Sequence, residues 1–224
     1  MKKYFTPFEM GLWCSSVVLI AVSFCIFDRE SYLTLAASII GVTALIFCAK
    51  GNPIGQFLMI IFGIIYGIIS FSFAYYGEMI TYMGMSVPMA VFSLITWLKN
   101  PYDDKKSEVK VNRVGGKEIV FALFLTAVVT VICYFILEAF GTANILPSTV
   151  SVMTSFFAVY LCSRRSPYFA LAYAVNDVVL ILLWILAVFE DISYMSVIIC
   201  FIVFLANDLY SFFNWLKMEK KQNK

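Results

Sequence analysis

Hydrophobic residues run along this chain in eight long stretches that are separated by short polar breaks. A helix needs about 20 mainly apolar residues to cross the hydrocarbon core of a bilayer, and each stretch is long enough. The predicted spans cover about residues 8–27, 31–49, 54–76, 79–98, 118–139, 144–162, 168–189 and 192–216. One long polar connection, residues 100–117, reads as a solvated loop. The pattern therefore predicts an all-α polytopic membrane protein with about eight transmembrane helices.

Composition supports this class and excludes others. Hydrophobic residues make up 62% of the chain and charged residues only 13%, whereas soluble domains carry about 25% charged residues. Histidine is absent, and the six cysteines stand singly in apolar stretches, so we predict no metal site or disulfide. No Walker A or G-x-G-x-x-G sequence is present, which argues against nucleotide hydrolysis. We predict no cofactor.

The basic residues set the predicted orientation, because lysine and arginine accumulate on the cytoplasmic side of membranes. With the N-terminus inside, only Arg29 of the 16 basic residues falls outside, so 15 agree. Both termini are therefore predicted to be cytoplasmic. The same topology leaves two acidic residues, Asp177 and Asp208, at membrane depth.

A weak internal repeat relates two sets of three spans. Trp97-Leu98-Lys99 ends the first set and Trp215-Leu216-Lys217 ends the second. Because both sets start on the same face, they are predicted to be parallel repeats, as in SWEET sugar transporters. The expected organisation is an N-terminal helix (1–30), a first repeat (31–99), a cytoplasmic loop and linker helix (100–143), a second repeat (144–217) and a tail (218–224).

Two similar polar segments lie inside apolar spans: AVNDVVLILLW (174–184) and LANDLYSFFNW (205–215). Asn176 lies 14 residues before Glu190 in the outer turn and Asn207 lies 17 residues after it. At ~1.5 Å per residue the two Asn-Asp pairs differ in depth by only about 4–5 Å. A charged aspartate at that depth costs about 2.5–3.5 kcal/mol on insertion scales, so each needs a partner, a proton or a wet cavity.

These residues have two interpretations. Asn176, Asp177, Asn207 and Asp208 either bind a polar cargo or form a structural polar clamp between helices. Trp184 is the tryptophan expected to contact cargo, whereas Trp97 and Trp215 are predicted to be interfacial anchors. Further candidates for cavity-lining residues are Tyr66, Tyr173, Tyr210 and Gln56. Gly63-x-x-x-Gly67 predicts close helix packing, and Pro88 predicts a kink in the fourth span.

On these segments the chain resembles the PnuC-type vitamin-precursor transporters, over roughly residues 33–217. The resemblance rests on YGEM (76–79), Pro88-Met89, YAVNDVVLILLW and FLANDLYSFFNWLK. It implies a SWEET-like 3+1+3 fold with an extra N-terminal helix, in a bacterial plasma membrane, and a homo-oligomer. It also implies uptake of nicotinamide riboside by facilitated diffusion, trapped by cytosolic phosphorylation for NAD biosynthesis. Helices of the second repeat contribute binding residues in this family.

The chemistry of the residues agrees with such a cargo. Nicotinamide riboside is a cationic aromatic ring on a ribose, so a carboxylate offsets its charge and amides pair with its hydroxyls. An indole or phenol ring stacks on the cation. Ala90 stands where the family pattern leads us to expect glutamine, which leaves thiamine or another vitamin as an alternative cargo.

Three other hypotheses stay open from sequence. A proton-coupled carrier would use Asp177 or Asp208 as its relay. An intramembrane aspartyl protease also needs two aspartates on neighbouring helices, but its Gly-x-Gly-Asp motif is replaced here by Asn-Asp. A structural or sensory membrane protein would bind no vitamin at all.

Overall fold

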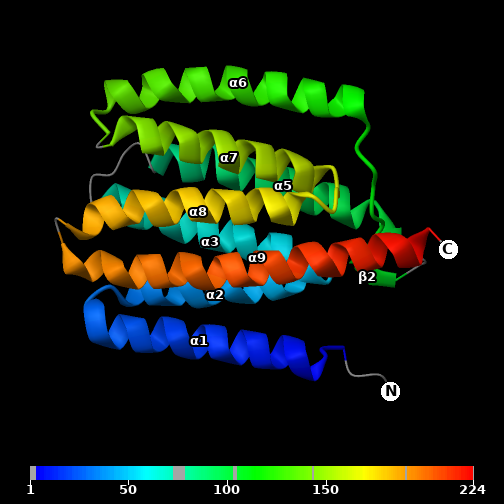
Figure 1. Ribbon diagram of the computed structural model, residues 1–224, viewed down its shortest axis with the longest axis horizontal. Helices are drawn as coiled ribbons and strands as arrows, with labels where there is room; N and C mark the ends of the chain where they lie inside the picture. The colour runs from blue at the N-terminus through cyan, green and yellow to red at the C-terminus, as the bar shows by residue number, and fades with distance from the viewer. Residues whose placement is uncertain (1–3, 73–78, 103–104, 143, 190, 224) are drawn as a thin grey trace.

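The structure is a computed structural model, and it describes residues 4–72, 79–102, 105–142, 144–189 and 191–223. Within these residues, eight helical segments are long and apolar enough to cross a membrane. They lie side by side with their long axes in nearly the same direction (Figure 1). The prediction of an all-α polytopic membrane protein is confirmed.

Each predicted span corresponds to one helical segment. The helices are α1 (Pro7–Phe27), α2 (Tyr32–Ala49), α3 (Pro53–Ser72), α5 (Val87–Leu98), α6 (Gly116–Ala139), α7 (Ile145–Ser163), α8 (Phe169–Val188) and α9 (Met195–Gln222). Shorter elements are the π-helix η1 (Thr81–Ser86), the 3-10 helix η2 (Ile192–Tyr194) and the antiparallel strands β1 (Pro101–Tyr102) and β2 (Lys105–Val109). The end of the predicted third span and most of the YGEM turn fall outside the described residues.

The fourth span is irregular at its start. It begins as η1 and continues as α5, and Pro88 occupies the first turn of α5. Proline has no N–H to donate to the preceding turn, so the irregular hydrogen bonding falls on its N-terminal side. A Cβ added at Gly63 would lie 2.8 Å from Val87, and one at Gly67 would lie 2.7 Å from Met83. The prediction that these glycines serve close helix packing is therefore confirmed.

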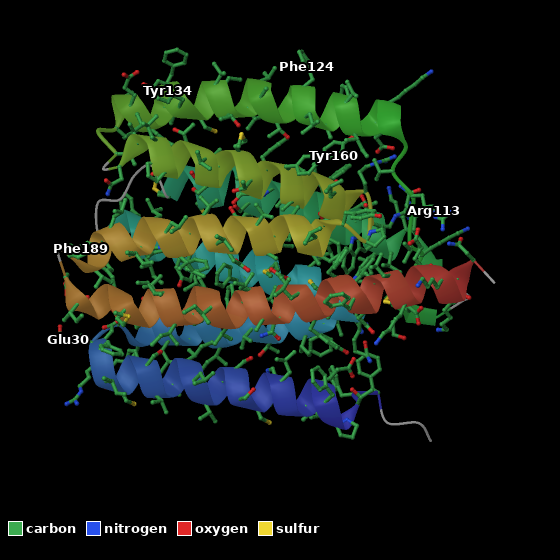
Figure 2. All side chains as sticks on the ribbon, viewed as in Figure 1. Glu30, Arg113, Phe124, Tyr134, Tyr160 and Phe189 are labelled. Atoms are coloured by element: carbon green, nitrogen blue, oxygen red, sulfur yellow. The ribbon has the colours of Figure 1, made fainter. Side chains whose placement is uncertain are left out.

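The helices pack as two groups with one helix at each flank. α2, α3 and α5 pack together, as do α7, α8 and α9, and α9 also packs against α2. α1 lies along one flank against α2 and α9, and α6 lies along the opposite flank against α7 (Figure 1). The outward side of α6 is apolar, and Phe124 points away from the bundle (Figure 2). Such a surface suits contact with lipid.

Both termini lie at one end of the bundle (Figure 1). We call it the basic end, because it carries Lys50, Arg164 and the lysines at the end of α9. Arg113 also lies at this end, whereas Glu30 and Phe189 lie at the opposite end (Figure 2). Arg164 pairs with Glu118 of α6, and this hydrogen bond raises the pKa of the Arg164 guanidinium.

The polar connection between α5 and α6 is folded onto the basic end. Val109 is fully buried, and its N–H donates to the carbonyl of Gly51 at 2.9 Å. The Gln222 side chain at the end of α9 accepts from the N–H of Val111 at 2.7 Å and donates to the carbonyl of Val109 at 3.1 Å. The prediction of a solvated loop is wrong for this part. Its alternating Val109 and Val111 were the signal of a half-buried strand.

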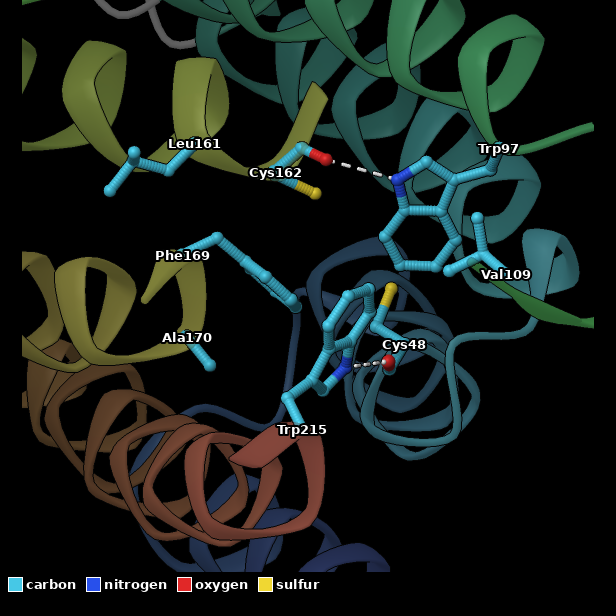
Figure 3. Packing of buried hydrophobic residues seen from close by; sticks show 8 residues of the cluster. All are labelled: Cys48, Trp97, Val109, Leu161, Cys162, Phe169, Ala170 and Trp215. Carbon is cyan, nitrogen blue, oxygen red and sulfur yellow. Dashed lines mark hydrogen bonds between the residues drawn. The ribbon is translucent and has the colours of Figure 1, made fainter. Parts of the chain in front are cut away.

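Trp97 and Trp215 are also buried, with none of their surface exposed. Trp97 donates its indole N–H to the carbonyl of Cys162 at 3.0 Å, and Trp215 donates to the carbonyl of Cys48 at 2.8 Å (Figure 3). The prediction of interfacial anchors is wrong for both. Each carbonyl also accepts from a backbone N–H just beyond its helix, from Gly51 at Cys48 and from Arg165 at Cys162, both at 2.9 Å, so the indole adds a second bond.

Candidate functional site

A central cavity of about 170 Å³ lies between the two helix groups. Its wall has contributions from α2, α3, η1, α5, α6, α7, α8 and α9. The apolar part of the lining includes Phe62, Phe201 and Phe204, and the polar part is made of hydroxyls, amides and two carboxyl groups. Among the residues that the structure describes, no lysine or arginine lines this cavity.

The two carboxyl groups belong to Asp177 on α8 and Asp208 on α9. They are 4% and 3% exposed and line the same cavity. An ionised carboxyl group can only accept hydrogen bonds, so each can receive a donor or a cation from a ligand. Asp177 Oδ2 is buried and has no hydrogen-bond partner in the described part of the chain. It is therefore an acceptor without a donor among the described residues, on a side chain that lines the cavity.

Asn176, the residue before Asp177, also lines the cavity. Its Oδ1 accepts hydrogen bonds from Thr154 at 2.8 Å and Ser155 at 2.9 Å, both on α7. These bonds occupy the amide oxygen and hold the side chain in place. The amide N–H groups are the part of Asn176 that can donate to a ligand.

Asn207, its counterpart on α9, points elsewhere. Its amide donates to Ser16 Oγ on α1 at 3.0 Å and to the carbonyl of Val203 at 2.8 Å. It is 1% exposed and is not among the described residues that line the central cavity. The structure therefore places Asp208, but not Asn207, at the cavity.

Three more of the predicted site residues line the cavity: Gln56, Tyr173 and Trp184. Gln56 donates from Nε2 to the sulfurs of Cys48 at 3.3 Å and Cys162 at 3.2 Å. Trp184 is also part of the wall of a second cavity, of about 680 Å³, at the end opposite the basic end. Trp184 thus stands between the central cavity and that outer space.

The other two predicted tyrosines lie away from the central cavity. Tyr210 donates to Glu9 of α1 at 2.8 Å. Tyr66 packs against Phe62 and Tyr82, with ring centroids 4.7 and 5.3 Å apart, and lines the second cavity.

Sequence analysis missed two features. Glu9 is 2% exposed and pairs with Lys50 at 3.0 Å, so it is a third buried acid beside Asp177 and Asp208. In the sequence, the capping-box pattern of Thr6 and Glu9 was the signal that this side chain has a structural role. Ser148, Ser151 and Ser155 form a hydroxyl wall on α7, and their helical spacing on one face was readable in the sequence.

A bundle of membrane-spanning helices that encloses a polar, acidic cavity is the architecture of a membrane transporter of small molecules. The sequence agrees with that class. The model of the family described as nicotinamide mononucleotide transporter matches residues 31–217. The chain belongs to this family, which makes it a transporter and not an intramembrane protease.

Known relatives cover almost the whole chain. The nicotinamide riboside transporter PnuC of Neisseria mucosa is 25% identical over 223 residues, which are 97% of this chain and 84% of the relative. The protein of the same name from Haemophilus influenzae is 22% identical, over 97% and 93% of the two chains. The crystal structure of the vitamin B3 transporter PnuC has the same fold, with a TM-score of 0.82 at 24% identity over 97% and 94% of the two chains.

Proposed function

We propose that this protein takes up nicotinamide riboside by facilitated diffusion through the central cavity, and that cytosolic phosphorylation traps the product. The single observation that carries the proposal is the charge of the cavity. Asp177 and Asp208 line it, and no lysine or arginine does so among the described residues. Such a site attracts a cation.

This charge favours the nucleoside over the nucleotide. Nicotinamide riboside carries one positive charge on its pyridinium ring. Nicotinamide mononucleotide adds a phosphate, and proteins hold phosphates with arginine, lysine or helix N-termini. Two buried carboxyl groups would repel it. The names of the relatives from Neisseria mucosa and Haemophilus influenzae agree with the nucleoside.

The proposed contacts follow from the geometry. Asp177 Oδ2, which has no donor among the described residues, faces the pyridinium charge, and the Asn176 amide donates to a ribose hydroxyl. Trp184 stacks on the ring by cation–π attraction. Gln56, Tyr173 and the hydroxyls of α7 complete the polar wall.

The proposed setting is the bacterial plasma membrane, with the basic end in the cytoplasm as the distribution of lysine and arginine favours. A homo-oligomer is proposed from the family resemblance, and chemical cross-linking in native membranes tests it. The division into two parallel three-helix repeats with α6 as linker is likewise proposed; the similar packing of α2–α5 and α7–α9 supports it.

The decisive experiment is uptake of radiolabelled nicotinamide riboside into proteoliposomes that contain the purified protein. We expect saturable uptake that stops at equal concentrations inside and outside, and no uptake of nicotinamide mononucleotide. Asp177→Asn should abolish it, whereas Glu138→Gln, which alters an exposed carboxylate on α6, should not. Transport of thiamine in place of nicotinamide riboside would reassign the cargo, and transport of the nucleotide would refute the charge argument.

A further inference from the structure

The second cavity, which we call the outer cavity, lies between α1, α2, α3, α8 and the η2–α9 segment at the end opposite the basic end. Its volume is about 680 Å³, within the range of about 300–1,000 Å³ that is usual for sites that hold small molecules. The central cavity, at about 170 Å³, is smaller than that range. A molecule of nucleoside size therefore has room in the outer cavity as it stands, whereas the central cavity has to widen to receive it.

Acidic side chains outnumber basic ones in the described wall of the outer cavity. Asp28 and Glu30 come from the turn between α1 and α2, and Asp191 comes from the turn before η2. Arg29 is the one basic residue among the described lining residues, and its Nε donates to the carbonyl of Cys25 at 2.8 Å. A wall with this balance of charge favours a cationic occupant over an anionic one.

Three aromatic rings line the same cavity: Tyr66, Trp184 and Tyr194. The rings of Trp184 and Tyr194 pack with their centroids 5.2 Å apart. Indole and phenol faces attract cations, and indole does so most strongly. Trp184 also lines the central cavity, so a cation on this ring stands at the boundary between the two spaces.

Helix α1, which lies outside the two helix groups, closes one side of the outer cavity. Its last residues, Ile26 and Phe27, and the turn that follows are part of the wall. Backbone bonds hold the acidic turns in shape: Asp28 Oδ1 accepts from the N–H of Ser31 at 3.2 Å, and Asp191 Oδ1 accepts from the next turn at 2.8 Å. The position of the carboxyl groups around this space is therefore built into the fold.

We propose that the outer cavity is a second binding site for cationic aromatic molecules, and that it holds a cargo molecule against Trp184 before the central cavity widens to receive it. Asp28, Glu30 and Asp191 offset the positive charge, and the ring of the cargo stacks on Trp184 or Tyr194. Occupancy of this site needs no ion gradient, so it agrees with facilitated diffusion. The inference rests on the proposed function and adds a site to it at the outer end.

Two properties distinguish this arrangement from a single central site. First, each chain binds two molecules, one in each cavity. Second, the outer site is the weaker and the more sensitive to salt. Glu30 and Asp191 are exposed to solvent, whereas Asp177 and Asp208 are buried, and salt screens exposed charges much more than buried ones.

The test counts binding sites on the full-length protein in detergent by equilibrium dialysis with radiolabelled nicotinamide riboside. We expect two molecules per chain, and raised ionic strength should weaken the weaker step only. The triple variant Asp28→Asn/Glu30→Gln/Asp191→Asn keeps side-chain size and the Oδ1 acceptors of both turns. It should weaken that step about three- to tenfold and leave the tighter step unchanged. Glu138→Gln, which alters an exposed acidic residue of α6 outside the described wall, should change neither step.

Asp177→Asn separates the outer site from the central one. Because this change disables the central cavity, one molecule per chain should still bind, weakly and with a strong dependence on salt. In proteoliposomes that contain the triple variant, the concentration for half-maximal uptake should rise about three- to tenfold, and the maximal rate should change little.

The outcomes separate the two proposals. A single binding step, a second step that ignores both salt and the triple change, or no binding to Asp177→Asn overturns the outer site and leaves the proposed function in place. Absence of any binding or uptake of nicotinamide riboside overturns the proposed function, and the outer site falls with it. Folding of the triple variant is checked by its elution as one species in size-exclusion chromatography. If it does not fold, the number of sites and the salt response of the unaltered protein decide the question.

Discussion

The two Asn-Asp pairs share a sequence, but the two asparagines have different surroundings. Asn176 on α8 lines the central cavity and accepts from Thr154 and Ser155 of α7. Asn207 on α9 donates to Ser16 of α1. The aspartates that follow them both line the cavity. One asparagine lines the cavity, and the other joins α9 to α1.

The difference follows from which helices lie on either side. Consecutive residues of an α-helix point about 100° apart, so each pair contacts two neighbours at once. α8 packs between α7 and α9, and α9 packs against both α8 and α1. The two aspartates lie on the sides of α8 and α9 that line the shared cavity. Asn176 instead contacts α7, and Asn207 contacts α1. A short motif therefore does not define a role until its neighbours are known.

Among substitutions at the two asparagines and their contacts, the largest effect on binding should come from Asn176→Ala. The change removes the proposed donor to the cargo and takes from Ser155 its acceptor, whereas Thr154 keeps the carbonyls of Val150 and Ser151 as acceptors. Loss of the hydrogen bond to the cargo costs about 1–3 kcal/mol, so affinity for nicotinamide riboside should fall about 5- to 150-fold. Isothermal titration calorimetry measures the dissociation constant of the purified variant for nicotinamide riboside. A dissociation constant within twofold of the unaltered protein would remove Asn176 from the binding site.

Asn207→Ala should give the opposite pattern. Its amide holds α1 through Ser16 and makes no contact with the cavity, so the dissociation constant should change less than twofold. Instead, the free energy of unfolding should fall by about 1–3 kcal/mol. A lower thermal unfolding midpoint in detergent would show this loss. An affinity loss equal to that of Asn176→Ala would erase the distinction between the two pairs.

Ser16→Ala should have the smallest effect, because it removes only one of the two acceptors of the Asn207 amide. We expect about 0.5–1.5 kcal/mol of destabilisation with normal transport. In a double-mutant cycle, Ser16→Ala should cost less in the Asn207→Ala background than alone. Strictly additive effects would show that α1 is held by other contacts, such as the Trp13–Thr43 bond.

Much of this structure was predictable from the sequence. The spans followed from length and hydropathy alone, and the equal depth of Asp177 and Asp208 followed from counting residues across one turn. The rotation of α9 that turns Asn207 toward α1 could not be predicted in this way, because it depends on packing against α1, a helix outside the repeat. The burial of Trp97 and Trp215 could not be predicted from the sequence either. Tryptophan near a helix end is usual at a membrane surface, and only the fold shows that each indole meets a carbonyl of another helix.

Those two indole bonds have a consequence for how the basic end opens. Trp97 of α5 reaches α7, and Trp215 of α9 reaches α2, so each helix group is tied to the other by the same bond in opposite directions. Separating the groups at this end breaks both bonds together and leaves two indole N–H groups without their acceptors, whereas both carbonyls keep a backbone donor. A half-open form would leave part of that set dry and unpaired, at about 1–3 kcal/mol for each group. The two bonds therefore favour separation of this end in a single step over partly separated forms.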